Sequence, residues 1–405
     1  MDMAKISTDP KKINEILTRG VERIYPSTEA LEKLLRSGKR IHLYLGIDPS
    51  GPKLHLGHAI TLRKLSQFQA LGHEVIMLIG DFTGMIGDPT DKTATRQKLS
   101  RKEVRDNSLN YKKWAGKFLS FSGPNSARLE YNSTWSDKLT FLDLIEITSN
   151  LTVQQMIGRD MFQERIKNGK PIHLHEFLYP VAQGYDSVAM DIDLELGGND
   201  QTFNMLVGRD LMKALSGKEK FVLSMKLLTD PSGKKMGKSE GNMVTMADSA
   251  ADMFGKIMSW PDERIPVAFE LLTDISEKEI QAIGADLKKG SVNPKELKIR
   301  LAKDIASFYH DKPAAEKASQ DFDRVFKSHG LPTDIPLVTF PLKPIPLLDL
   351  LTKTKLSSSK SDAQRLIAQG ALKIDGAVEK DWKKTISPRS GMVIQVGKRR
   401  FAKIK

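Results

Sequence analysis

The strongest constraint on the fold is a strand, helix and strand pattern between Arg40 and Gly80. The apolar run "RIHLYLGI" (40–47) predicts a strand, and the residues "DPSGP" after it are typical of a turn. Apolar residues then recur at helical spacing over 56–71, and "EVIMLIG" (74–80) predicts a second, buried strand. Two strands joined through a helix form a right-handed parallel crossover, so we expect a parallel α/β sheet.

Two histidines stand at the first turn of that helix, in "HLGH" (55–58). This turn follows the C-terminal end of a strand, where open parallel sheets bind ligands. A helix N-terminus offers unpaired N–H groups and the positive end of a dipole, and imidazole donors beside it suit a phosphate. We therefore expect His55 and His58 to stabilise charge on a nucleotide phosphate, with Gly57 admitting the ligand close to the backbone. Taken alone, the pattern also fits capping or surface histidines.

A second segment, "DPSGKKMGKSEGN" (230–242), combines turn residues with three lysines. We expect a cationic loop that closes over a triphosphate, where ammonium groups stabilise the departing pyrophosphate. A lysine cluster by itself is more often a solvated surface. Together with H-x-G-H at a strand-to-helix turn, it favours nucleotide chemistry.

Two further segments have the pattern of a substrate pocket. In "EFLYPVAQGYDSVAM" (176–190), the side chains of Tyr179, Gln183 and Asp186 share one helix face among apolar neighbours, which favours a lined pocket over a solvent face. The stretch "LELGGNDQTFN" (194–204) predicts a strand end with two glycines, followed by an acid and an amide. That arrangement suits a ribose whose hydroxyls donate to a carboxylate.

The composition excludes several other classes of protein. The 405 residues contain no cysteine, which excludes disulfide frameworks and thiolate metal sites. Neither the N-terminus nor any apolar run approaches the roughly 18 to 20 residues of a membrane span, so we expect a cytoplasmic protein with no membrane partner. The 63 Lys and Arg outnumber the 50 Asp and Glu, and the net charge of +13 favours a polyanionic partner.

Positive charge is concentrated at the C-terminus, which is predicted to be a separate module. Residues 346–405 hold fourteen Lys or Arg against five Asp or Glu. Five prolines in "LPTDIPLVTFPLKPIP" (331–346) predict an extended connector before it. Within the module we expect a helix capped by Ser359 or Ser361 and ended by Gly370, followed by short strands in "ALKIDG", "MVIQVG" and "RFAKI".

The histidine pair, followed some 180 residues later by "KMGKS" (235–239), resembles the paired motifs of class I aminoacyl-tRNA synthetases. Leu56 replaces a common isoleucine and Gly237 a common serine, and both changes keep the chemistry of the motifs. The pocket segments resemble tyrosyl-tRNA synthetases of the bacterial type over about residues 35–245 and 346–405. The implied fold is α/β: a Rossmann-like parallel-sheet catalytic domain, a helical domain and a small C-terminal α+β RNA-binding domain.

The resemblance and the composition together predict four parts of the chain. They are a catalytic domain (1–245, with an insertion at about 115–175), a helical anticodon-side domain (246–330), a proline-rich linker (331–345) and an alpha-L type RNA-binding domain (346–405). Family precedent places a dimer interface in the insertion, so a homodimer is expected.

The resemblance also assigns roles to single positions. Tyr44 and Asp186 are expected to bind the phenol hydroxyl of tyrosine, and Asp88, Tyr179 and Gln183 its α-ammonium. The expected sets are, for catalysis, His55, His58, Lys235, Lys238 and Ser239; for ATP, Gly46, Asp48, Ser50, Gly57, Gly198, Asp200 and Lys238; for tyrosine, the five residues above with Thr83 and Gln201; and for RNA, Lys355, Lys360, Arg365, Lys373, Lys398, Arg399 and Arg400.

The implied reaction has two steps. The carboxylate of L-tyrosine attacks the α-phosphorus of ATP bound with Mg²⁺, and the terminal adenosine of the tyrosine-specific tRNA then attacks the acyl carbon of the adenylate. A carboxylate and a phenol deep in an apolar pocket would be left unpaired by phenylalanine, which favours discrimination without editing. No structural metal is expected. Glu195 stands where many relatives have glutamine and has no assigned role.

Three alternatives stay open from the sequence. A tryptophan-activating relative shares both motifs but ordinarily lacks the C-terminal module. A nucleotidyltransferase of cofactor biosynthesis shares H-x-G-H but is usually much shorter. A non-catalytic RNA-binding protein derived from a synthetase would keep the module and lose the lysine segment. An ATP–pyrophosphate exchange assay across the amino acids distinguishes these proteins.

Overall fold

The computed structural model describes residues 5–90, 98–229, 243–327, 335–340, 342–397 and 400–405. The chain divides into two units, Met1–Ala247 with Pro261–Pro294, and Asp248–Trp260 with Lys295–Lys405. Each unit is described by itself below.

The first unit is built on a six-stranded sheet with the strand order β1-β6-β5-β2-β3-β4. The five strands from β2 to β6 run parallel to one another, whereas the edge strand β1 is antiparallel to its neighbour β6. The strands are β1 (Val21–Tyr25), β2 (His42–Ile47), β3 (Glu74–Ile79), β4 (Arg128–Tyr131), β5 (Leu194–Gly198) and β6 (Phe221–Met225). The predicted α/β fold with a Rossmann-like parallel sheet is confirmed.

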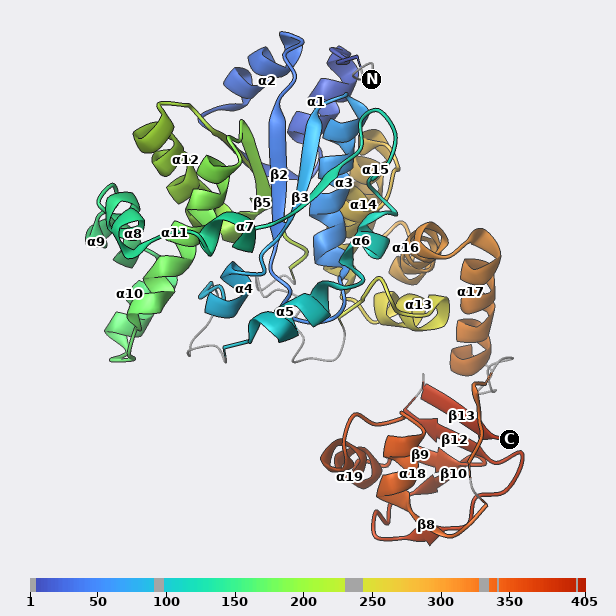
Figure 1. The fold of residues 1–405 in the computed structure, drawn as a ribbon. Coiled ribbons are helices and arrows are strands. Elements are labelled where there is room, and N and C mark those ends of the chain that lie inside the picture. The colour runs from blue at the N-terminus through green and yellow to red at the C-terminus, as the bar shows by residue number, and fades with distance from the viewer. Residues whose placement is uncertain (1–4, 91–97, 230–242, 328–334, 341, 398–399) are drawn as a thin grey trace. The chain divides into compact units, whose positions relative to one another are not determined.

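Two crossovers in opposite directions fix where this sheet can bind a ligand. From β2 the chain passes through α3 (Leu56–Ala70) to β3, and from β5 through α12 (Thr202–Ser216) to β6. Because parallel crossovers are right-handed, two crossovers that step across the sheet in opposite directions place their helices on opposite faces of the sheet. Figure 1 shows α3 and α12 on opposite sides of the strands. The strand order therefore reverses between β2 and β5, and the crevice for a ligand lies at their carboxyl ends.

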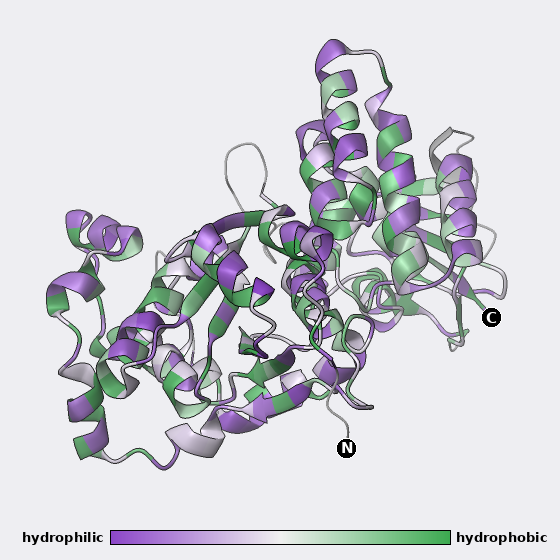
Figure 2. Ribbon diagram, turned by 90° about the horizontal axis from the view of Figure 1, so that it is seen from above, coloured by the Kyte–Doolittle hydropathy of each residue, from purple (hydrophilic) through white to green (hydrophobic). Residues whose placement is uncertain are grey.

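The other helices of the first unit cover the sheet and extend from it. They are α1 (Pro10–Thr18), α2 (Thr28–Arg36), α4 (Thr83–Ile86), α5 (Arg101–Ser108), α6 (Tyr111–Ala115), α7 (Ser133–Ser136), α8 (Phe141–Thr148), α9 (Val153–Ile157), α10 (Asp160–Lys167), α11 (Leu174–Ala189), α14 (Ile265–Leu272) and α15 (Glu277–Lys289). Figure 2 shows hydrophilic and hydrophobic residues alternating along the helices, as expected for helices that bury one face.

One strand lies inside the range predicted as an insertion. β4, with the sequence "RLEY", pairs parallel with β3, so the sheet continues through residues 128–131. Each of its four side chains is at least partly exposed, because the strand is at the sheet edge. A strand of this kind has no apolar run, and the sequence pattern therefore did not reveal it.

The second unit combines three helices with the C-terminal module. The helices are α13 (Ala250–Met258), α16 (Pro294–Tyr309) and α17 (Lys312–Lys327). The helices predicted within 246–330 are thus shared between the units, since α14 and α15 belong to the first.

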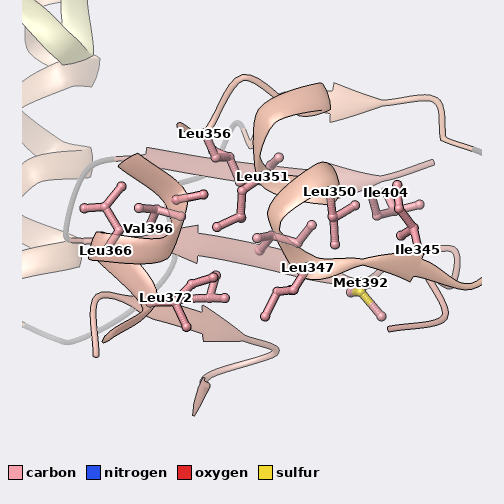
Figure 3. Close-up of a cluster of buried hydrophobic side chains, with 14 residues drawn as sticks. Ile345, Leu347, Leu350, Leu351, Leu356, Leu366, Leu372, Met392, Val396 and Ile404 are labelled. Carbon is pink, nitrogen blue, oxygen red and sulfur yellow. The ribbon is translucent and has the colours of Figure 1, made fainter. Parts of the chain in front are cut away.

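The C-terminal module has a five-stranded sheet in the order β10-β9-β12-β13-β7 and a two-stranded sheet of β8 and β11. Its elements are β7 (Leu337–Val338), β8 (Ile345–Pro346), α18 (Leu347–Lys353), α19 (Lys360–Ala368), β9 (Leu372–Ile374), β10 (Ala377–Glu379), β11 (Thr385–Ile386), β12 (Val393–Val396) and β13 (Arg400–Ile404). Ser359 caps α19 by accepting from the N–H of Asp362, as the sequence predicted, and Gly370 follows the helix with a positive φ of 71°. Figure 3 shows side chains of both helices, such as Leu350 and Leu366, converging with those of the strands in one core.

Part of the predicted connector takes part in these sheets. β7 pairs parallel with β13 at the sheet edge, and β8 pairs with β11. Prolines are tolerated there because an edge strand does not need every backbone N–H. In the part of the chain that the structure describes, no helix has the length and apolar character needed to span a membrane.

Candidate active site

A pocket of about 380 Å³ lies at the carboxyl ends of β2 and β5, where the strand order reverses. It brings together every predicted catalytic, ATP-binding and tyrosine-binding residue that the structure describes. These are Tyr44, Gly46, Asp48, Ser50, His55, Gly57, His58, Thr83, Asp88, Tyr179, Gln183, Asp186, Gly198, Asp200 and Gln201. They come from five separate segments between residues 44 and 201.

Lys235, Lys238 and Ser239 lie outside the described residues, but both flanks of their segment reach the pocket. Leu227 and Leu228 line it on one side, and Met243 and Val244 on the other. After the segment, the backbone runs along the histidine turn: the N–H of Leu56 donates to Val244 O at 3.1 Å, and the N–H of Met246 donates to Leu54 O at 2.8 Å. The described residues on both sides of segment 230–242 therefore lie at the pocket or beside the histidine turn.

The two histidines cap helix α3 and also face the pocket. His55 Nδ1 accepts from the N–H of Gly57, and His58 Nδ1 accepts from the N–H of His55, both at 3.1 Å. Because each Nδ1 accepts a hydrogen bond, the proton of each neutral ring is on Nε2. Capping uses Nδ1 of each ring and leaves the proton on Nε2, so the observed capping is compatible with the predicted phosphate binding.

Gly57 has a local reason for being glycine. A Cβ at this position would lie 2.8 Å from Cε1 and 2.9 Å from Nδ1 of His55, whose ring folds over the helix start. The glycine is needed for the cap, independently of any ligand.

Tyr44 and Asp186 form the deep end of the pocket, and both are almost fully buried. The carboxylate of Asp186 accepts from Trp135 Nε1 at 2.8 Å and from Asn132 Nδ2 at 3.2 Å. Burial raises the pKa of Asp186 well above its usual range, although these two donors oppose the shift. Burial likewise raises the pKa of Tyr44. The deep end is thus an apolar setting with a carboxyl group and a phenol close to one another.

Asp48, predicted to bind ATP, contacts two residues predicted to bind tyrosine. Its Oδ1 accepts from Thr83 Oγ1 at 2.6 Å, and its Oδ2 from the hydroxyl of Tyr179 at 2.9 Å. Burial, followed by the charge of Asp48, raises the pKa of Tyr179. Two other residues predicted to bind tyrosine contact each other, since Gln201 Nε2 donates to Asp88 Oδ2 at 2.7 Å.

Glu195, which the sequence left without a role, is buried beside Gln183. Its Oε1 accepts from Gln183 Nε2 at 3.1 Å, while its Oε2 pairs with the ammonium of Lys220. Lys220 also donates to Ser187 Oγ at 2.8 Å, and that oxygen lies 3.1 Å from the hydroxyl of Tyr44. Burial lowers the pKa of Lys220, whereas the neighbouring carboxylate favours its charged form.

Several residues of the site were missed from the sequence. Asn132 and Trp135 follow the edge strand β4, and their role could have been inferred had that strand been recognised, because they lie beyond its carboxyl end. Lys220 directly precedes β6. Among the described residues, no three His, Asp or Glu side chains are grouped in a way that could hold a metal ion.

The predicted RNA contacts that the structure describes are in the C-terminal module, and all of them are exposed. Lys360 pairs with Asp349 at 2.6 Å and Arg365 with Asp362 at 2.7 Å, whereas Arg400 donates to Leu356 O at 2.7 Å. The exposed side chains of Lys355 and Lys373 make no ion pair with other described residues. Lys398 and Arg399 lie outside the described residues.

Comparison with known proteins identifies the family. A family model for class I tRNA synthetases of the tryptophan and tyrosine group matches residues 36–327, and one for the C-terminal domain of SYY-like tyrosine–tRNA ligases matches residues 328–404. The tyrosine–tRNA ligase of Moorella thermoacetica is 43% identical over 404 residues, which cover 99% of this chain and 97% of that protein. That of Thermotoga maritima is 42% identical over 396 residues, with 98% of each chain covered. The chain belongs to the tyrosine–tRNA ligase family.

Membership of the tyrosine–tRNA ligases confirms the resemblance inferred from the motifs and makes the chain a class I aminoacyl-tRNA synthetase. A crystal structure of a C-terminally truncated mitochondrial tyrosyl-tRNA synthetase from Coccidioides posadasii superposes with a TM-score of 0.61 at 24% identity, covering 76% of this chain and 91% of that chain. At that identity the likeness concerns the fold.

Proposed function

We propose that this ligase activates L-tyrosine with ATP, releasing pyrophosphate, and transfers the tyrosyl group of the adenylate to the 3′-terminal adenosine of tyrosine-specific tRNA. One observation carries the proposal: the residues expected for ATP and those expected for tyrosine line a single pocket at the switch point of the sheet. Catalysis then consists of positioning two substrates and stabilising charge on the phosphates.

Recognition of the substrate side chain is assigned to the deep end of the pocket. The phenol of tyrosine donates to Asp186 and accepts from the hydroxyl of Tyr44. Phenylalanine would leave both buried groups without a partner, which costs more than the lost contact itself. Trp135 and Asn132 hold the carboxyl group of Asp186 in place through its two oxygens.

The α-ammonium group of tyrosine is assigned to Gln183, Tyr179 and Asp88. Gln183 Oε1 is buried and finds no hydrogen-bond partner among the described residues, which supports a role as acceptor for a ligand. Asp88 adds a carboxylate to the same pocket. With its ammonium and phenol both held, the tyrosine carboxylate is directed toward the ATP side.

The phosphates of ATP are assigned to the first turn of α3. The Nε2–H groups of His55 and His58 add donors to the helix N-terminus, and Lys235 and Lys238 are proposed to bring positive charge from the segment whose two flanks line the pocket. Mg²⁺ is proposed to arrive with ATP as part of the substrate. In-line attack of the tyrosine carboxylate at the α-phosphorus then releases pyrophosphate without a covalent enzyme intermediate.

An exchange assay tests this assignment. ATP–pyrophosphate exchange is expected to depend on tyrosine, and exchange that depends on tryptophan, or none at all, contradicts the proposal. Asp186→Asn is expected to lower the ratio of kcat/KM for tyrosine over phenylalanine by about tenfold or more, since the buried carboxyl group that pairs with the phenol is lost. Asp191→Asn, at an exposed acid just after α11, is the matched control and is expected to keep the ratio.

The C-terminal module is proposed to bind tRNA through phosphate contacts that read RNA shape more than sequence. Lys355 and Lys373 are its best candidates among the described residues, because their ammonium groups are exposed and unpaired within that part of the chain. The helices of 246–330 are proposed to serve the anticodon side. The cytoplasm is the proposed location.

The protein is also proposed to be a homodimer. Large apolar side chains are exposed within residues 141–174, which belong to the predicted insertion: Phe141 is 79% exposed, Val153 70% and Leu174 83%. A soluble monomer rarely exposes so many large hydrophobic side chains on neighbouring elements. Light scattering is expected to give the mass of a dimer, and Leu174→Lys to shift it toward the monomer.

A further inference from the structure

A buried cation lies just outside the tyrosine pocket and contacts two groups that lead into it. Lys220 is 0% exposed, directly precedes β6 and does not line the pocket. Its ammonium reaches Glu195 Oε2 and Ser187 Oγ, and these residues are 2% and 0% exposed. Each of them contacts a predicted tyrosine-binding side chain, namely Gln183 and Tyr44. The alternative to a role in substrate binding is that this buried ion pair contributes only to stability.

The space for this ammonium is built into a neighbouring helix. A Cβ at Gly208 of α12 would lie 2.5 Å from Lys220 Nζ and 3.1 Å from Ser187 Oγ. The glycine also approaches Gly184 of α11, whose Cα would be 3.2 Å from that Cβ. The absence of a side chain at residue 208 thus leaves room for a charged group under the pocket.

The ammonium fixes the orientation of Gln183 through Glu195. A lysine ammonium can only donate, and the carboxylate paired with it can only accept. Glu195 Oε1 therefore takes the amide N–H of Gln183, at 3.1 Å, and the amide must turn its oxygen the other way. That oxygen is the buried Oε1 of Gln183, which has no hydrogen-bond partner among the described residues. The amide thus presents an acceptor, as an α-ammonium donor requires.

The same ammonium limits the possible directions of a second chain of hydrogen bonds. Lys220 donates to Ser187 Oγ at 2.8 Å, so the hydroxyl proton of Ser187 goes to Tyr44 at 3.1 Å or to Glu195 at 3.4 Å. The contact with Tyr44 is shorter, and Glu195 Oε2 already accepts from Lys220. When the Ser187 proton is assigned to Tyr44, the phenolic proton of Tyr44 is assigned in turn to the substrate, whose own hydroxyl proton goes to Asp186.

We propose that Lys220 is a positioning residue for amino-acid selection: its donor-only ammonium makes Gln183 an acceptor and Tyr44 a donor toward bound tyrosine. This inference rests on the proposed function and adds to it a residue that touches neither substrate. It also gives Glu195 a role, since the carboxylate transmits the polarity to Gln183.

The test compares Lys220→Met, Ser187→Ala and the double variant Lys220→Met with Glu195→Gln, all in the full chain. In exchange assays, each is expected to lower the kcat/KM ratio of tyrosine over phenylalanine by about tenfold or more, mainly through the KM for tyrosine. The KM for ATP is expected to stay within about twofold. Lys218→Met is the matched control, because Lys218 pairs with Asp191 and Asp193 away from the pocket.

The double variant separates positioning from stability. Lys220→Met alone leaves a buried carboxylate without its cation and is expected to lower the melting temperature. Adding Glu195→Gln removes that charge and is expected to restore the melting temperature without restoring selectivity, because a glutamine at residue 195 donates as readily as it accepts. A tyrosine over phenylalanine ratio within about twofold of the wild type in the double variant would overturn the proposal.

Two further outcomes have fixed meanings. If Lys220→Met does not fold, Ser187→Ala, which removes a single hydroxyl, decides alone, and an unchanged ratio in it overturns the proposal. If the unmodified protein shows no tyrosine-dependent exchange, the proposed function fails first. Exchange in the wild type with full selectivity in all three variants refutes only the inference about Lys220.

Discussion

Gly80→Ala is a single-methyl perturbation aimed at the centre of the pocket. Gly80 follows β3, and a Cβ there would lie 2.0 Å from Asp48 Oδ1 and 2.4 Å from Thr83 Oγ1. Ordinary contacts of a Cβ begin near 3.4 Å, so the carboxylate must retreat by about 1 Å or more. Asp48 is held by Thr83 at 2.6 Å and by Tyr179 at 2.9 Å, and it cannot retreat and keep both partners.

The expected size of the effect follows from these contacts. A hydrogen bond to a charged group contributes about 1.5 to 3 kcal/mol, and overpacking costs about 1 to 3 kcal/mol. Because Asp48 is proposed to contact ATP and is hydrogen-bonded to Tyr179, we expect a loss of about 3 kcal/mol in transition-state stabilisation. This corresponds to a fall of about a hundredfold in kcat/KM for tyrosine-dependent exchange.

The assay is pyrophosphate exchange with thermal unfolding measured in parallel. Thr83→Val removes the same hydrogen bond without the clash, so its loss is expected to be about tenfold and smaller than that of Gly80→Ala. A Gly80→Ala protein that folds and keeps kcat/KM within about threefold of the wild type would refute the reasoning, because Asp48 would then be free to move without consequence.

Three further predictions concern stability and RNA binding. Burial lowers the pKa of His73 to about 4, so between about pH 6.5 and 4 the unfolded state binds a proton that the folded state does not. The free energy of unfolding, measured by urea titration, is therefore expected to be highest above pH 6.5 and to fall by about 3 kcal/mol toward pH 4. His73→Gln is expected to lose this pH dependence. Gly284→Ala, inside α15 with open space around the new methyl group, is expected to raise the melting temperature through about 0.5 to 1 kcal/mol of helix propensity, and a lower value contradicts this. Lys373→Gln is expected to weaken tRNA binding and to reduce the slope of log affinity against log salt by about one unit, whereas an unchanged slope removes this lysine from the interface.

The parts of the fold that the sequence predicted are those with a strong hydrophobic period. β2, α3 and β3 match the predicted strand, helix and strand because an apolar run, a 3.6-residue period and a turn agree with one another. β4 escaped prediction because it is four residues long and lies at the edge of the sheet, where little apolar surface is buried. A local sequence pattern also does not reveal which strands far apart in sequence pair with each other, so the pairing of β7 with β13 was not predicted.

The sequence predicted those residues of the candidate site whose side-chain chemistry suits direct contact with a nucleotide or an amino acid. The spacing predicted that Tyr179, Gln183 and Asp186 share one face of α11, and the resemblance implied that this face and the histidine turn belong to one site, as the pocket shows. Residues that hydrogen-bond to pocket side chains were missed, because Asn132 and Ser187 carry no sequence pattern of their own. Their importance comes from partners that only the packed sheet brings within reach.

Glu195 did carry a physical signal that could have led to its partner. A carboxylate in a buried parallel strand, here within "LELGG", is costly unless a cation lies beside it. β5 pairs with β6, and the residue opposite Glu195 is Val222. Side chains alternate between the faces of a sheet, so a cation on the same side belongs two residues from Val222, at Lys220 or at position 224. Position 224 is a serine, which leaves Lys220, and the glycine at residue 208 of the covering helix then provides the space that its ammonium occupies.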